Sequence, residues 1–166
     1  MTRTARIGLI LGGLVLGMAV PAFAQTATAN LGISATVNKT CTITTTAVAF
    51  GVYDPVVTHA SAPLTATGSV VVTCTKGAGT RIDLDNGGNF AAGARRMSGG
   101  GDFLTYELYQ DSGYATVWGS GAGSGNTIGA APSKAARTVT VYGRVPAGQD
   151  VSAASYADTV VATINF

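Results

Sequence analysis

Few side chains in this sequence are suited to covalent catalysis. Of its 166 residues, His59 is the only histidine, and Cys41 and Cys74 are the only cysteines. A nucleophile paired with a histidine base would have to use His59. That residue lies in the loop-like segment THASAP, and no GxSxG motif occurs in the chain. We therefore interpret His59 as a surface loop residue and predict no catalytic residues, no metal site and no cofactor.

The carboxylates form two further patterns. Residues 83–88 read DLDNGG, but the fifth and twelfth positions of an EF-hand calcium loop would lack oxygen-bearing side chains, so a strand entering a turn is favoured. Asp102, Glu107 and Asp111 suggest the carboxylate pair of a glycosidase. Because exposed carboxylates at strand edges are common, we interpret all three as solvated charges around a strand.

The first 24 residues have the three parts of a secretory signal peptide. Two arginines precede an uncharged apolar run at 7–20, and the sequence AFA at 22–24 has the small-x-small cleavage pattern. The run of 14 residues is shorter than the roughly 20 residues needed to span a bilayer. We predict removal of residues 1–24 by cleavage between Ala24 and Gln25.

The predicted mature chain, residues 25–166, has eight Lys and Arg against eight Asp and Glu. A net charge near zero gives no electrostatic reason to expect nucleic acid or an anionic membrane as a partner. In an exported chain, a single pair of cysteines predicts a disulfide between Cys41 and Cys74. Closing a loop of about 34 residues would stabilise the fold by about 3.5–4 kcal/mol.

Strand signals dominate the mature chain, which is rich in Thr, Val and Gly and shows no sustained helical periodicity. A glycine-rich stretch, residues 87–129, is predicted to form long loops on either side of one strand. Six to eight short strands in one domain predict a β-sandwich. The predicted strands lie at 31–37, 40–46, 68–75, 80–85, 103–110, 138–145 and 159–166, with a short piece at 47–51.

Both ends of the mature chain alternate between apolar and polar residues. A chain that ends on a long apolar strand leaves an open sheet edge, which natural proteins avoid exposing. One end therefore offers a strand, and the other end needs one. The alternating apolar residues are Leu31, Ile33, Ala35 and Val37 in the first segment and Val160, Ala162, Ile164 and Phe166 in the last.

The mature chain resembles the spore coat protein U family, which includes the subunits of archaic chaperone–usher pili. The similarity extends over the whole mature chain, with its segments in the same order. The segments that carry it are LGISATV at 31–37, FGVYDP at 50–55, VTCTKG at 72–77, RIDLDNGG at 81–88, RRM at 95–97, LTYELYQD at 104–111, VWG at 117–119, VTVYGRVP at 139–146 and YADTVVATINF at 156–166.

The resemblance implies an all-β fold, a single incomplete immunoglobulin-like β-sandwich at 38–166 that is completed by a donor strand from another subunit. A periplasmic chaperone would first fill the gap, and an outer-membrane usher would exchange it for the donor segment, residues 25–37. The implied destination is a cell-surface pilus that supports adhesion and biofilm formation. The donor residues would be Leu31, Ile33, Ala35 and Val37, and the acceptor groove would be lined by Val160, Ala162, Ile164 and Phe166.

Two alternatives to a pilus subunit stay open. The first is a spore or cell-surface coat component of the same family. The second is a monomeric secreted carbohydrate-binding module with a complete sandwich, although aromatic residues in a sandwich more often fill the core or its rim. Within a pilus, the length of the chain favours a shaft or adaptor over a tip adhesin with an added receptor-binding domain. The aromatic residues in question are Tyr106, Tyr109, Tyr114, Trp118 and Tyr142.

Overall fold

A computed structural model describes residues 23–166, and most of the predicted signal peptide lies outside these residues. Residues 23–35 form one unit and residues 36–166 belong to a second. The strand expected at 31–37 is not formed in this chain, because these residues make no ladder hydrogen bonds among the described residues. Leu31, Ile33 and Val37 are 85%, 89% and 81% exposed.

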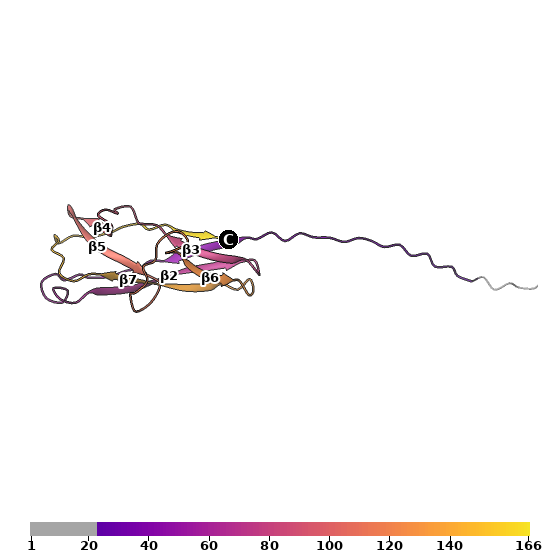
Figure 1. Cartoon of the computed structure of the whole chain (residues 1–166), viewed down its shortest axis with the longest axis horizontal. Coiled ribbons are helices and arrows are strands. Elements are labelled where there is room, and N and C mark those ends of the chain that lie inside the picture. The colour runs from indigo at the N-terminus through magenta and orange to yellow at the C-terminus, as the bar shows by residue number, and fades with distance from the viewer. Residues whose placement is uncertain (1–22) are drawn as a thin grey trace, which may run out of the picture. The chain divides into compact units, whose positions relative to one another are not determined.

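Residues 36–166 form two antiparallel β-sheets (Figure 1). One sheet has the strand order β1-β2-β7-β5-β4, and the other has the order β6-β3-β8. The prediction of an all-β sandwich is therefore confirmed. Between residues 23 and 166 no helix is long and apolar enough to cross a membrane. The strands are β1 (Cys41–Thr46), β2 (Leu64–Cys74), β3 (Gly79–Leu84), β4 (Arg95–Gly99), β5 (Asp102–Tyr109), β6 (Asn126–Ala130), β7 (Arg137–Val145) and β8 (Ala162–Asn165).

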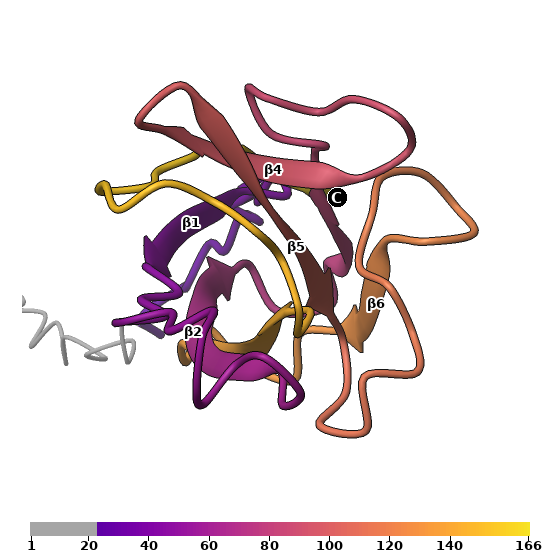
Figure 2. The same ribbon diagram turned by 90° about the vertical axis from the view of Figure 1, so that its left-hand side faces the viewer.

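The strands of the two sheets surround the core, as the end-on view in Figure 2 shows. Alternate residues of these strands point into it. Trp118 is fully buried at its centre, and its indole N–H donates to the carbonyl oxygen of Ile82 at 2.8 Å. Because side chains alternate along a strand, Thr and charged residues occupy the outward-facing positions. The buried strand residues are Val70, Val72, Ile82, Leu84, Leu104, Tyr106, Leu108, Val141 and Val145.

The predicted disulfide is confirmed. Cys41 and Cys74 lie directly opposite each other in the β1–β2 ladder and are bonded. They pack with Ala78 and Ala131 in a small second core cluster at this end of the sandwich. The bond therefore joins the first strand of the domain to the end of its longest strand.

The glycine-rich stretch is more ordered than the prediction of long loops. It contains β4 and β6, and β4 turns into β5 through Gly100 and Gly101, whose φ angles are +60° and +92°. A two-residue hairpin loop whose central residues both have positive φ matches the twist of the flanking strands. Glycine adopts positive φ without steric cost. The loop prediction was wrong here because composition alone does not distinguish a hairpin turn from a flexible linker.

His59 is also placed differently from its prediction as a surface residue. It is 8% exposed and stacks on Tyr53 with ring centroids 5.0 Å apart. Its Nδ1 accepts a hydrogen bond from the Asp54 amide at 3.0 Å. The apolar neighbours and this bond make His59 an internal brace of the turn at 54–60.

A buried arginine joins the two sheets. Arg95 on β4 is 2% exposed and forms an ion pair with Glu107 on β5. Its guanidinium also donates to the carbonyl oxygens of Asp85 at the end of β3 and of Trp118, at 2.6 and 2.9 Å. The prediction that Glu107 is a solvated charge was therefore wrong, since Glu107 neutralises a cation buried between the sheets.

We predict that replacing Arg95 with Ala lowers the free energy of unfolding by about 3–5 kcal/mol, because it leaves Glu107 and several carbonyl oxygens without their donor. Urea unfolding followed by the fluorescence of the buried Trp118 measures the change. Arg96→Ala is the matched control, since Arg96 lies over the Phe103 ring at 4.1 Å and should contribute only about 1 kcal/mol. Equal unfolding midpoints for the two variants would contradict the bridging role.

Candidate functional site: an open groove between two rims

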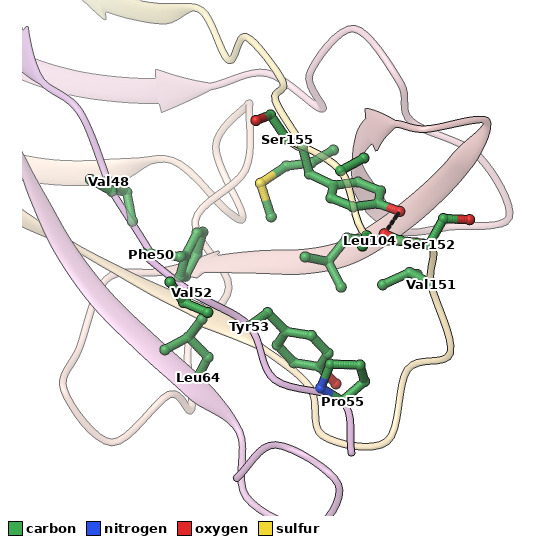
Figure 3. A pocket seen from close by; sticks show the side chains of 16 residues that line it. Val48, Phe50, Val52, Tyr53, Pro55, Leu64, Leu104, Val151, Ser152 and Ser155 are labelled. Atoms are coloured by element: carbon green, nitrogen blue, oxygen red, sulfur yellow. Dashed lines mark hydrogen bonds between the residues drawn. The ribbon is translucent and has the colours of Figure 1, made fainter. Parts of the chain in front are cut away.

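A long apolar groove runs along one side of the domain. It consists of two connected clefts of about 690 and 420 Å³, and Val48, Phe50 and Met97 line both. One rim is residues 45–55, which continue from β1, and the other rim is residues 151–162, which lead into β8. Figure 3 shows Val48, Phe50 and Tyr53 facing Leu104 and Val151 across the wider cleft. The floor is formed by the inward side chains Leu64, Val70, Leu84, Leu104, Tyr106, Leu108 and Val141.

Both rims carry backbone groups without partners. Within the described residues, neither 47–53 nor 150–156 makes a backbone–backbone hydrogen bond. The strands that continue these rims are also single-sided, since β1 pairs only with β2 and β8 only with β3. Unpaired strand edges of this kind are templates for an additional strand. The groove therefore has both apolar side-chain space and hydrogen-bonding groups for one extended segment.

Two glycines let the first rim cross the sheet. A Cβ atom on Gly143 of β7 would lie 2.6 Å from Val48 Cγ1 and 2.7 Å from Phe50 Cζ. On β2, a Cβ atom on Gly68 would lie 2.6 Å from the carbonyl oxygen of Thr46. Since real contacts of this kind are not that short, only glycine allows residues 46–50 to lie directly on β2 and β7. This close approach sets the depth of the groove wall.

Hydrogen bonds of two side chains, Tyr53 and Gln149, hold the first rim in place at the wider cleft. The Tyr53 hydroxyl donates to the carbonyl oxygen of Pro146 at 3.0 Å and accepts from the Gln149 amide at 3.0 Å. The Gln149 side chain in turn accepts from the Thr105 amide at 2.7 Å and donates to the Thr105 carbonyl at 2.9 Å. The first rim is thus fixed to β5 through the loop that precedes the second rim.

The second rim is fixed by two aspartates. Asp102 accepts hydrogen bonds from the Ser152 hydroxyl and from the Ser152 amide. Both bonds lower the pKa of the Asp102 carboxyl, and the bond from the hydroxyl has the larger effect. Asp158 accepts from the Tyr106 hydroxyl at 2.7 Å and from the Gly88 amide at 2.9 Å. Burial and then the bond to Asp158 raise the pKa of Tyr106 well above its usual range, so the phenol stays neutral. The second rim is therefore held in place by hydrogen bonds within the domain itself.

Two of the carboxylates considered for chemistry are held within their own local structure. Asp83 pairs with Arg81 at 2.8 Å, and Asp111 accepts from three backbone amides of its own loop. Among residues 23–166 no group of three or more His, Cys, Asp or Glu is placed to hold a metal ion. Trp118 and Tyr106 are core residues, which removes two members of the suggested sugar-binding face.

Two of the four acceptor residues predicted from the sequence line the groove, and the other two lie outside it. Val160 and Ala162 line the narrower cleft. Ile164 packs against both core clusters near the disulfide, and Phe166 is 53% exposed at the end of the chain. The residues that sequence reasoning missed are on the opposite rim and on the wider cleft. The alternation of AVAF at 47–50 signalled a strand-like segment but gave no indication that it borders a groove.

We predict that Gly143→Ala lowers the free energy of unfolding by about 1–3 kcal/mol, because the added methyl group displaces Val48 and Phe50. Gly79→Ala is the matched control, since a Cβ there meets nothing within 4 Å. Urea unfolding measures the stability, and methyl NMR shifts of Val48 report the displacement of the rim. An unfolding midpoint for the Gly143 variant equal to that of the control would contradict the close-packed wall.

Comparisons with known proteins agree with this architecture. Residues 27–163 match the family model of the Spore Coat Protein U domain. Protein U of Myxococcus xanthus is 41% identical over 160 residues, which cover 88% of each chain. A chain in the crystal structure of the CsuC–CsuE chaperone–tip adhesion subunit pre-assembly complex, from archaic Csu pili of Acinetobacter baumannii, has a similar fold. Its TM-score is 0.57 at 23% identity, and the match covers 79% of this chain but only 41% of that one. The family match and the curated relative together place this chain in the Spore Coat Protein U family.

Proposed function

We propose that the mature chain is a structural subunit of a cell-surface pilus that polymerises by donor-strand complementation. Residues 25–37 of one copy would fill the groove of the next copy as an added strand. The observation that carries the proposal is the groove itself, because residues 47–53 and 151–156 of its rims make no backbone–backbone hydrogen bond within the described chain. Because the contact is head-to-tail and does not close, it generates a fibre.

The donor segment complements the groove in chemistry. Leu31, Ile33 and Val37 are each more than 80% exposed, and they alternate as one face of a strand requires. Burying the three would contribute about 5–8 kcal/mol, reduced by the entropy lost when the segment becomes ordered. Ala35, the small member of the set, suits a shallow part of the groove. Cleavage between Ala24 and Gln25 would free this segment.

The partners follow from the same incomplete fold. The family resemblance implies that a periplasmic chaperone covers the open groove before assembly and that an outer-membrane usher exchanges it for the donor strand. The similar fold in the CsuC–CsuE complex, which is a chaperone–subunit complex by its description, supports this part of the proposal. The resulting fibre would be exported through the periplasm and would support adhesion and biofilm formation. Membership of a family of structural proteins agrees with the expectation that the chain is not an enzyme.

A coat component is the second candidate, because the matching family is named for a spore coat protein. Both candidates need the chain to be structural. They differ in whether the assembly is a fibre extended through donor strands or a layer on a surface. Electron microscopy of the assembled protein distinguishes the two.

We predict that deleting residues 25–36 leaves a subunit that still binds its chaperone but cannot extend a polymer, because it has a groove and no donor strand. On an unboiled denaturing gel, the intact mature protein should give a ladder of bands and the deletion variant a single subunit band. The disulfide in the deletion variant serves as a folding control. A normal ladder from the deletion variant would defeat the proposed function.

We also predict that Ile33→Asp weakens assembly, because it places an unpaired charge in an apolar groove. Ser34→Asp is the matched control, since Ser34 lies on the opposite face of the same extended segment. Ladder formation by the two variants at equal concentration is compared. Similar losses for both would show that the segment does not bind through one apolar face.

A further inference from the structure

The two ends of the sandwich carry opposite charges. All three lysines of the chain lie in loops at the end that holds the disulfide. Lys39 precedes β1, and the next residue, Thr40, bonds to Thr75, the residue before Lys76. Lys134 lies in the loop that joins β6 to β7, close to where Ala131 bonds to Ala78. These loops, residues 36–40, 75–78 and 131–136, contain no Asp or Glu. We call this end the lysine pole, and the C-terminus marks it in Figure 1.

The opposite end is acidic and apolar. Asp54, Asp102 and Asp150 lie in or beside its turns, and residues 51–63 and 146–156 contain no Lys or Arg. The hairpin that carries Asp102 also carries one cation, Arg96, which lies over the Phe103 ring at 4.1 Å. Val56 and Val57 lie in one of these turns and Val52 lies just before it, and the three are 81%, 74% and 84% exposed. We call residues 52–57 the valine knob. Arg144, near the end of β7, is the nearest cation along that strand, and it lies over the Tyr114 ring at 5.6 Å.

The valine knob has a fixed conformation. The Asp54 carboxylate accepts hydrogen bonds from the amides of Val56 and Val57 at 3.0 and 3.1 Å. Both bonds lower the pKa of the Asp54 carboxyl, and the bond from Val57 has the larger effect. The buried His59 ring braces the same turn from inside. A turn built so firmly around exposed valines presents a constant apolar surface instead of a flexible one.

We propose that the valine knob and the acidic loops around it bind the lysine pole of the neighbouring subunit in the fibre. The inference rests on the proposed function. The last strand of a complete immunoglobulin sandwich runs antiparallel to the strand before it. A donor strand antiparallel to β8 would end, at Val37, beside the knob. Only residues 38–40 then separate Val37 from the donor's own Cys41, so the donor's lysine pole must lie against the acceptor's knob.

The charges favour the same direction independently. A donor strand running the other way would bring its lysine pole against the acceptor's lysine pole, placing six like charges at one joint. Antiparallel insertion instead brings three lysines to three aspartates. The apolar stems of the lysines can cover the exposed valines while their ammonium groups reach the carboxylates. The joint between subunits would thus have a second contact besides the donor strand.

A zero-length carbodiimide cross-linker, which joins a lysine amine only to a carboxylate in direct contact, tests the contact in assembled fibres. Mass spectrometry should find cross-links from Lys76 or Lys134 to Asp150. Such links must join two subunits, because the eleven residues of β2 separate the poles of one subunit by about 35 Å. In 1 M salt, where the Debye length is about 3 Å, the cross-links should be lost while the ladder persists.

Variants make the outcome unambiguous. Asp150→Asn should abolish these cross-links without affecting the ladder, and Asp111→Asn, which lies outside the acidic end, should leave them intact. Fibres that show a normal ladder but no pole-to-pole cross-link would overturn this inference and leave the proposed function standing. Absence of a ladder from the unmodified protein would overturn the proposed function and the inference with it.

Discussion

The whole structure depends on a strand position that residues 23–166 leave unfilled. A backbone N–H or C=O group at a sheet edge must find a partner, and apolar side chains between two sheets must be covered. Within the described part of the chain, residues 47–53 and 150–156 make no backbone–backbone hydrogen bond, and the apolar side chains between them line an open groove. Everything around them keeps this position open: glycines under one rim, aspartates behind the other, and a tyrosine network between their ends.

Rigidity around the groove matters because an unfilled position would otherwise collapse. The buried Arg95 holds the ends of β3, β4 and β5 together, and the Cys41–Cys74 bond closes the opposite end. Asp158 and Tyr106 fix the second rim before it enters β8. A groove held open in this way would bind the proposed donor segment with little rearrangement, so more of the burial energy would be available for assembly.

A fibre made of such subunits has properties that one contact cannot supply. In the proposed fibre, the apolar donor strand would provide most of the affinity, because it would bury side chains along the groove. A contact between oppositely charged poles adds little affinity in water but fixes the direction of insertion and the orientation of successive subunits.

The sequence by itself determined the all-β class, the disulfide and most of the strands. These features depend on local alternation and on residue type, which are visible one segment at a time. It did not determine β4, β6, the buried His59 or the Arg95–Glu107 pair, because the same residue types also occur in loops and on surfaces. Only the tertiary structure decided which segments border the groove. The segment at 47–53 becomes a rim through the glycines of β2 and β7 beneath it, which lie far from it in sequence and close to it in space.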